Sequence, residues 1–233
     1  ISLYRFRSLA SIIQERKTMN KTILFDLDGT LIDSTKAILF GFKKAYEAFG
    51  ETAPCDEDIK ALIGYTLEDI FTKLGVNGNV DEYVKIYKEA YKTAYLKDTV
   101  LLSSAFEALS EASKIADVGI VTTKTSRYSA DILRNLGVMK FINTVVGRDD
   151  VINPKPNPEP INEALKRLGK TSVQDKASAF MIGDTTMDLE SAKRAGIVGI
   201  GLVCGYGKGV DLRGNSNLIF KNAFEAVKFI AGR

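Results

Sequence analysis

Residues 23–34 read ILFDLDGTLIDS, and this stretch decides the fold. It opens with Ile23, Leu24 and Phe25, a continuous apolar run of the kind that forms a strand buried on both faces of a parallel sheet. Asp26 and Asp28 follow at once. Two carboxylates about 4 Å apart repel each other by roughly 4 kcal/mol at the effective dielectric of a protein surface. The sequence therefore predicts a compensating group at the end of this strand.

Four more short apolar runs predict the remaining strands. They lie at residues 118–121, 144–146, 179–182 and 199–203. Each run is continuous rather than alternating, and helical patterns separate most of them, as in parallel strands joined by crossover helices. We therefore predict an α/β fold with a doubly wound parallel sheet.

The interval between the first two predicted strands is longer than one crossover requires. Its helical periodicity falls in four segments, at residues 35–49, 56–63, 66–74 and 81–97. We expect Asp56 and Thr66 to be N-caps of two of these helices. The prediction is that residues 34–97 form a small helical domain inserted into a core made of residues 19–33 and 98–233.

Tyrosines recur every four residues in the last of these helices, at positions 83, 87, 91 and 95. A stripe at this spacing lies on one face of a helix. We expect it to pack the helical insert rather than to stack on a ligand.

Composition excludes several classes of protein. The 233 residues are 45% hydrophobic and 26% charged, as in an ordinary globular domain. The net charge is only +3, with no basic block interleaved with aromatic residues, so we expect no nucleic acid partner. No apolar run approaches the ~20 residues of a membrane span. Cys55 and Cys204 form no metal-binding or disulfide pattern, which favours a reducing cytoplasm.

The chain contains no histidine. The side chain that most often serves as a general base near neutral pH is therefore missing, and so is the commonest transition-metal ligand. Acid–base chemistry must fall to carboxylates, lysine, tyrosine or cysteine. Any metal must be held by oxygen ligands.

Polar residues follow the predicted strands at the ends where open parallel sheets bind ligands. Asp26 and Asp28 follow the first strand, and Thr122 and Thr123 follow the strand at 118–121. Two further groups join the same edge: Asp184, with Asp188, after the strand at 179–182, and Lys155 after the strand at 144–146. One lysine does not offset four acids. Mg²⁺ is the cation that suits carboxylate oxygens together with water and a substrate phosphate.

A metal ion, a lysine and a hydroxyl together form a binding site for a phosphoryl group, whose negative charge must be balanced during transfer. Asp26 is placed to attack phosphorus and form an aspartyl-phosphate. Asp28 is two residues further on, where its side chain faces the leaving group as a general acid and later as a general base. Gly29 permits a sharp turn there, and Thr30 is expected to tie that turn through its hydroxyl.

Four segments, in order, resemble the successive motifs of the haloacid dehalogenase-like superfamily. They are FDLDGTLIDS (25–34), GIVTTK (119–124), PKPNPEP (154–160) and MIGDTTMDLESAKRAG (181–196). The resemblance implies a Rossmann-like core, with the helical insert as a small α-helical cap that closes over the substrate.

The same resemblance implies roles for individual residues. Asp26 is then the nucleophile and Asp28 the general acid/base. The Thr122 hydroxyl and the Thr123 backbone contact the phosphate, and Lys155 stabilises its charge.

The resemblance also implies a Mg²⁺ site. Its ligands are the Asp26 carboxylate, the Asp28 backbone carbonyl and the Asp184 carboxylate. Asp188 either orients these ligands without binding the metal itself or forms an ion pair with Lys155.

The leading function is hydrolysis of a small phosphorylated metabolite. Resemblance to phosphoglycolate phosphatases rests on FDLDGTLIDS, on LIGYTLEDIF (62–71) and on VCGYG (203–207). DDVINPKPNPEP (149–160) also resembles inorganic-pyrophosphate hydrolases, which keeps pyrophosphate open as a substrate. The alternatives are a phosphosugar mutase, a dehalogenase and a phospho-accepting signalling domain.

Several narrower expectations follow. We expect substrate choice to depend on Gly64, Tyr65 and Thr66, and Asp33 and Ser34 to be cap or turn residues rather than catalysts. The protein is expected to be a monomer or a homodimer. Residues 1–18 precede Met19 as an N-terminal extension, either foreign to the native chain or a short basic targeting helix.

Overall fold

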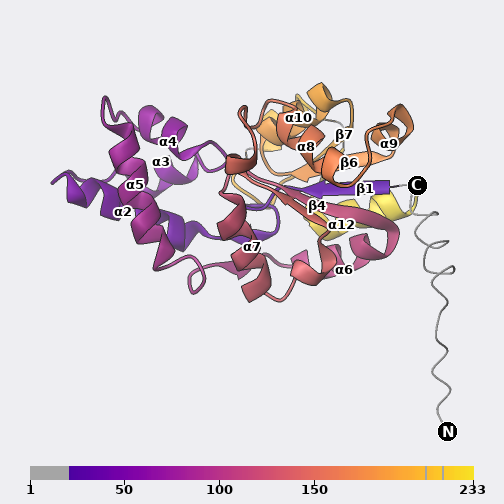
Figure 1. Ribbon diagram of the computed structural model, residues 1–233, viewed down its shortest axis with the longest axis horizontal. Coiled ribbons are helices and arrows are strands. Elements are labelled where there is room, and N and C mark those ends of the chain that lie inside the picture. The colour runs from indigo at the N-terminus through magenta and orange to yellow at the C-terminus, as the bar shows by residue number, and fades with distance from the viewer. Residues whose placement is uncertain (1–20, 208, 217) are drawn as a thin grey trace, which may run out of the picture.

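A computed structural model describes residues 21–207, 209–216 and 218–233. The extension expected at residues 1–18 lies outside this part of the chain. The described residues form two lobes, one built on a β-sheet and one built of helices (Figure 1). None of the described helices is long and apolar enough to cross a lipid bilayer.

A six-stranded sheet lies at the centre of the larger lobe. In spatial order its strands are β5 (Thr144–Val146), β4 (Ala116–Val121), β1 (Lys21–Phe25), β6 (Ala179–Gly183), β7 (Val198–Leu202) and β8 (Ile219–Phe220). Every neighbouring pair is parallel. The chain runs outward from β1 through β4 to β5 and then returns to β6 on the other side of β1. Strand order therefore reverses beside β1, where such sheets bind ligands.

Helices cover both faces of this sheet (Figure 1). One face carries α6 (Ala105–Ile115), α7 (Ser126–Asn135) and α12 (Ala223–Ala231), and the other carries α8 (Glu159–Arg167) and α10 (Thr186–Ala195). Because side chains alternate along a strand, Ile23 and Phe25 enter the first layer and Leu24 the second. The α/β fold with a doubly wound parallel sheet is thus confirmed. Shorter elements are η1 (Met139–Phe141), η2 (Arg148–Asp150), α9 (Val173–Ala177) and α11 (Gly209–Arg213).

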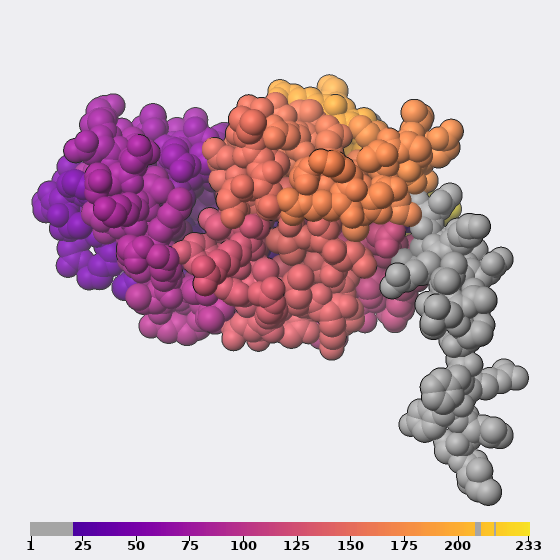
Figure 2. Space-filling model, in the orientation of Figure 1, coloured from indigo at the N-terminus to yellow at the C-terminus, as the bar shows by residue number. Residues whose placement is uncertain are grey.

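The smaller lobe contains four helices, all within the segment predicted as an insert. They are α2 (Thr35–Ala48), α3 (Asp56–Lys60), α4 (Leu67–Lys73) and α5 (Val80–Lys92). This lobe lies beside the sheet lobe in Figure 2 and has its own apolar core, in which the Phe42 and Phe71 rings are 4.7 Å apart. The chain enters and leaves it through β2 (Ile32–Asp33) and β3 (Val100–Leu101), which pair antiparallel.

The tyrosine stripe packs this core. Tyr83, Tyr87 and Tyr91 are buried in it, and Tyr95 packs against it. The predicted helix over residues 81–97 is too long, because α5 ends at Lys92 and the chain continues in turns such as that closed by Lys97 N–H on the Ala94 carbonyl (3.1 Å). Tyr95 nevertheless stacks on Tyr91, with ring centroids 5.7 Å apart.

Of the two predicted N-caps, one is confirmed and one is wrong. The Thr66 hydroxyl accepts a hydrogen bond from the Asp69 N–H at 3.2 Å, so Thr66 caps α4 as expected. The prediction for Asp56 is wrong, because Asp56 is the first residue of α3 and Cys55 occupies the N-cap position. An acid in the first turn of a helix is favoured by the helix dipole as well as by capping, so the sequence does not separate the two positions.

Candidate active site

The loop after β1 turns within a few residues. The Asp26 N–H donates to the Ile182 carbonyl (2.9 Å), which extends the sheet to the first acid, and the Leu31 N–H then closes back on the Leu27 carbonyl (2.9 Å). Gly29 has φ of +83°, a conformation that side chains disfavour. A Cβ there would also lie 2.5 Å from Asp184 Oδ2. The tight turn therefore brings the loop against Asp184 and leaves Asp26 and Asp28 at the carboxyl edge of the sheet.

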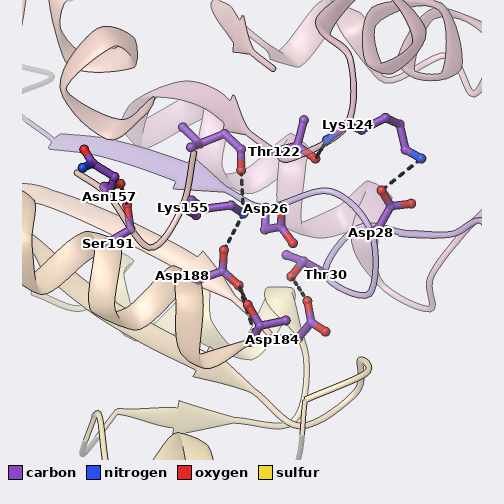
Figure 3. Close-up of polar contacts among 12 residues, drawn as sticks. Asp26, Asp28, Thr30, Thr122, Lys124, Lys155, Asn157, Asp184, Asp188 and Ser191 are labelled. Carbon is purple, nitrogen blue, oxygen red and sulfur yellow. Dashed lines mark hydrogen bonds and ion pairs between the residues drawn. The ribbon is translucent and has the colours of Figure 1, made fainter. Parts of the chain in front are cut away.

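Lys155 lies at the centre of the buried polar cluster (Figure 3). Its ammonium donates to Asp26 Oδ1 (2.7 Å), Asp188 Oδ1 (2.6 Å) and the Val121 carbonyl (3.1 Å), which uses all three N–H groups. Burial alone would lower the pKa of this ammonium, but Asp188 and Asp26 together raise the pKa above its ordinary value. Lys155 is therefore a fixed positive charge between an acid that follows β1 and an acid in the first turn of α10.

The loop that carries Lys155 is held from α10. The Ser191 hydroxyl donates to the Asn157 carbonyl at 2.8 Å, and the Arg194 guanidinium donates to the Pro156 carbonyl at 3.2 Å. These two bonds fix the backbone on the far side of Lys155. The position of its ammonium is thus set by the helix that also supplies Asp188.

Asp188 and Asp184 have different surroundings. Asp188 Oδ2 accepts hydrogen bonds from the N–H (3.0 Å) and hydroxyl (2.7 Å) of Thr185, the N-cap of α10, while its other oxygen pairs with Lys155. Asp184 accepts one bond from the Thr30 hydroxyl (2.9 Å) and one from the Tyr206 N–H (2.8 Å). The expectation that Thr30 ties its own turn is wrong, since its hydroxyl bonds instead to Asp184, the residue after β6.

The acids are short of positive charge. Carboxylate oxygens of Asp26, Asp184 and Asp188 lie within 4.8 Å of one another, and all three side chains are buried. Burial, with the charge of Asp188, raises the pKa of Asp184 to about 7. Burial also raises the pKa of Asp26, against the opposing effect of Lys155. A cation would offset this repulsion, and a set of oxygen ligands fits a hard divalent metal ion.

The Asp28 side chain points away from this cluster (Figure 3). Its Oδ2 lies 3.2 Å from the Lys124 ammonium, and its Oδ1 accepts a hydrogen bond from the Ser34 hydroxyl. Ser34 was expected to be only a cap or turn residue. It occupies the N-cap position of α2, but its hydroxyl bonds to Asp28 and makes no capping bond. Asp33 does bond to the chain locally, accepting from the Thr35 N–H at 2.9 Å.

No role was predicted from the sequence for Lys124, a charged residue of the site. Its ammonium contacts both Asp28 and the hydroxyl of Tyr91 (2.9 Å), and its side chain is 10% exposed. Burial would lower its pKa, but the charge of Asp28 together with the phenols of Tyr91 and Tyr87 outweighs burial and raises the pKa. The available signal was its position directly after Thr122 and Thr123, at the same strand end.

The two threonines after β4 lie where the sequence predicted. Thr122 is buried, and its hydroxyl accepts a hydrogen bond from the Lys124 N–H at 3.2 Å. Thr123 lines a cavity of about 80 Å³ together with Asp28 and Lys124. A cavity needs ~10–15 Å³ by this measure for each water, so several waters or a small polar molecule fit.

The helical lobe supplies the other wall of this cavity. Gly64 and Tyr65, which were expected to influence substrate choice, line it together with Tyr87 and Tyr91 of α5. Thr66, named with them, caps α4 and is absent from the described lining. The cavity is therefore bounded by both lobes, with Asp28 on the side of the sheet.

Comparison with known proteins agrees with this geometry. The family model described as haloacid dehalogenase-like hydrolase matches residues 23–202. A relative named pyrophosphatase PpaX from Bacillus velezensis is 35% identical over 176 residues, which cover 75% of this chain and 79% of the relative. A phosphoglycolate phosphatase from Aquifex aeolicus is 31% identical over 179 residues, covering 76% of this chain and 81% of the relative.

A solved structure shows the same fold. The haloacid dehalogenase-like family hydrolase from Streptococcus pneumoniae superposes with a TM-score of 0.80 at 27% identity, over 90% of this chain and 97% of that chain. The match of the family model includes five of the six sheet strands, all but β8, and the four helices of the smaller lobe. The chain therefore belongs to the haloacid dehalogenase-like hydrolases.

Proposed function

We propose that the protein is a Mg²⁺-dependent phosphatase that hydrolyses a small phosphorylated metabolite through an aspartyl-phosphate on Asp26. The observation that carries the proposal is that the side chains of Asp26 and Asp28, two acids in one turn, point in different directions. Asp26 points to Lys155 and the acid cluster, whereas Asp28 points to the cavity. This arrangement supports a nucleophile beside the charge-balancing groups and a separate acid beside the leaving group.

The proposed reaction has two steps. In the first, an Asp26 carboxylate oxygen attacks phosphorus, the bond from phosphorus to the ester oxygen breaks, and Asp28 gives its proton to that oxygen. In the second, a water attacks the phosphorus of the aspartyl-phosphate, Asp28 accepts the proton of the water, and inorganic phosphate leaves Asp26. Thr122, Thr123 and Lys155 are proposed to hold the phosphoryl oxygens in both steps.

The proposed metal site uses the Asp26 and Asp184 carboxylates and the Asp28 backbone carbonyl. When bound there, Mg²⁺ would offset the charge of the acids and of the phosphoryl oxygens. Asp188 is proposed to support this site rather than to bind the metal, because its two oxygens are occupied by Thr185 and Lys155.

Residues 34–97 are proposed to act as a cap that covers the substrate. Support comes from the separate apolar core of the helical lobe and from the cavity lined by both lobes. The small size of the cavity favours a compact substrate such as phosphoglycolate, contacted at its far end near Gly64 and Tyr65. We further propose that the substrate is the main partner, that the protein is a monomer or a homodimer, and that it acts in the cytoplasm.

Inorganic pyrophosphate is the second candidate substrate. Several relatives that are 32–36% identical to this chain are named pyrophosphatase PpaX, for example those of Listeria monocytogenes and Bacillus cereus. Pyrophosphate is also small and highly charged, so it suits a cavity with Lys124 on its wall. In that case the leaving group is a second phosphate.

A substrate panel tests the proposal. Purified protein is assayed for phosphate release from phosphoglycolate, pyrophosphate, β-glucose 1-phosphate and other small phosphate esters, with Mg²⁺ or with EDTA. We expect Mg²⁺-dependent release from at least one of the first two, and no release by the Asp26→Asn variant. Isomerised sugar phosphate without phosphate release would instead indicate a mutase. Equal release by Asp26→Asn would show that the nucleophile is wrongly assigned.

A further inference from the structure

The segment Gly205–Tyr206–Gly207, which follows β7, lies against the metal ligand proposed at Asp184. The Tyr206 N–H donates to Asp184 Oδ2 at 2.8 Å. A Cβ at Gly205 would overlap the Asp184 carboxylate, and a Cβ at Gly207 would overlap the Asp184 carbonyl oxygen. Both glycines are therefore required for this close approach, and the backbone between them orients Asp184.

The side chain of Tyr206 reaches the other lobe. Its hydroxyl shares a hydrogen bond with the hydroxyl of Thr35 (2.9 Å), the first residue of α2, and lies 3.5 Å from Asp33 Oδ1 in β2. The ring packs against the apolar core of the helical lobe. It also covers Gly29, where a Cβ would lie 2.7 Å from Tyr206 Cδ2.

These contacts attach Tyr206 both to the sheet lobe and to the helical lobe, which would move relative to each other if the helical lobe acts as a cap. The backbone of Tyr206 is bound to Asp184, beside the loop of Asp28, and its phenol is bound where the chain enters the helical lobe. The chain passes between the lobes at the paired strands β2 and β3. A rotation of α2 about this β2–β3 crossing would break the contact with Thr35 and free residues 205–207 to move away from Asp184.

We propose that Tyr206 is a positioning residue that couples the orientation of the helical lobe to metal binding at Asp184. The proposal rests on the metal site of the proposed function and adds a link between that site and the cap. Because such coupling is reciprocal, Mg²⁺ favours the lobe orientation seen here, and that orientation strengthens Mg²⁺ binding by the same factor. One net hydrogen bond corresponds to a factor of about three to ten.

The test measures how well ordered the connection between the two lobes is, and it needs no catalytic turnover. Hydrogen–deuterium exchange of peptides covering residues 32–38 and 99–103 is followed with and without Mg²⁺, in the absence of substrate. We expect Mg²⁺ to slow exchange there by about three- to tenfold in the wild-type protein. In Tyr206→Phe, which keeps the ring and the backbone N–H, we expect less than a twofold effect.

A double-mutant cycle identifies the contact. Thr35→Val should remove the Mg²⁺ effect as Tyr206→Phe does, and the double variant should match Tyr206→Phe, because both changes delete the hydrogen bond between these two hydroxyls. Tyr95→Phe is the matched control, since its hydroxyl bonds to Asp131 (3.3 Å) instead. Wild-type slowing that survives in Tyr206→Phe would overturn the proposal.

Glycine variants test the contact between residues 205–207 and Asp184. Gly207→Ala should weaken Mg²⁺ binding, measured by calorimetry, by more than about tenfold, because its Cβ displaces Asp184. Gly214→Ala is the control, since the nearest atom to its Cβ is the Asp211 carbonyl oxygen at 3.5 Å. Unchanged Mg²⁺ affinity in Gly207→Ala would contradict the proposal.

The two proposals fail in different ways. A wild-type protein that binds Mg²⁺ in calorimetry without slower exchange at the crossing overturns the coupling and leaves the proposed phosphatase standing. A protein that shows the coupling but releases phosphate from no ester overturns the phosphatase alone.

Discussion

The Lys124 ammonium lies 3.2 Å from Asp28 Oδ2, and both side chains are almost fully buried at the wall of the cavity. The same ammonium donates to the Tyr91 hydroxyl of α5. The acid proposed to serve the leaving group is therefore paired with a cation that also contacts the helical lobe. Removing that cation would leave a buried carboxylate whose one remaining side-chain partner among the described residues is the Ser34 hydroxyl.

The first prediction concerns Lys124→Met. We expect kcat/KM to fall about 10- to 100-fold, because Asp28 loses the charge that holds it in place. The free energy of unfolding should fall by up to about 3 kcal/mol, the lower end for breaking a buried pair, since the cavity lets water reach Asp28. Steady-state kinetics and urea denaturation measure the two effects. Lys114→Met, at an exposed ion pair on α6, is the control. Wild-type kinetics in Lys124→Met would contradict the assignment.

The second prediction concerns Asp26→Asn. Turnover should fall by at least about 10³-fold, because the amide cannot form the aspartyl-phosphate. Stability without metal should be unchanged or higher, since burial and neighbouring acids raise the pKa of Asp26 and the neutral amide avoids that repulsion. Lys155 keeps its bond to Asp188 at 2.6 Å. Turnover and thermal unfolding are measured on the same samples, with Asp81→Asn in the first turn of α5 as control.

The third prediction concerns the metal. Mg²⁺ at 100 times its Kd should raise the free energy of unfolding by about 2.7 kcal/mol. For a chain of this size, that corresponds to about 5–10 °C in Tm, and EDTA should reverse it. Asp184→Asn should remove the shift, because it deletes a proposed ligand from the acid cluster. A full Mg²⁺ shift in Asp184→Asn would show that the metal is held elsewhere.

The fourth prediction separates Asp188 from Asp184. In the absence of metal, Asp188→Asn should lower the free energy of unfolding by about 2–4 kcal/mol, because it weakens the pair with buried Lys155 and also the two hydrogen bonds from Thr185, which Asp26 lacks. Asp184→Asn should have a smaller effect, since Asp184 has no ion pair of comparable length among the described residues. Urea denaturation in EDTA measures both. Equal losses would contradict the supporting role of Asp188.

The sequence predicted the sheet and the edge where the acids meet, for a physical reason. Parallel strands buried on both faces are continuous apolar runs, and their carboxyl ends share one edge, so Asp26, Thr122 and Asp184 are placed by strand order alone. β8 was not predicted, because two residues give no periodic signal. The structure then shows what spacing does not determine, namely the direction of each side chain.

Three side chains illustrate this limit. Ser34 bonds to Asp28, Thr30 bonds to Asp184, and Lys124 reaches both Asp28 and Tyr91. Each contact joins segments whose relative position depends on the packing of the whole fold. The predictions for Ser34 and Thr30 were a cap and a turn, and none was made for Lys124; tertiary structure overrides the local preference. The segment around Tyr206 is similar, since it was recognised only as a resemblance.

The last prediction is a pH dependence at Asp150, in η2 near the loop of Lys155. Burial would raise the pKa of Asp150, but hydrogen bonds from the Arg167 guanidinium (2.7 Å) and the Gly147 N–H (2.8 Å) outweigh it and lower the pKa. A lowered pKa stabilises the folded state above the unfolded value of ~3.9, and this stability is lost as the pH falls through the folded value. Asp150→Asn should therefore lose about 0.5–1 kcal/mol at pH 7, as for a partly exposed pair, and nothing near pH 2. Urea denaturation at both pH values measures this, and an equal loss at both would show that packing, not charge, is responsible.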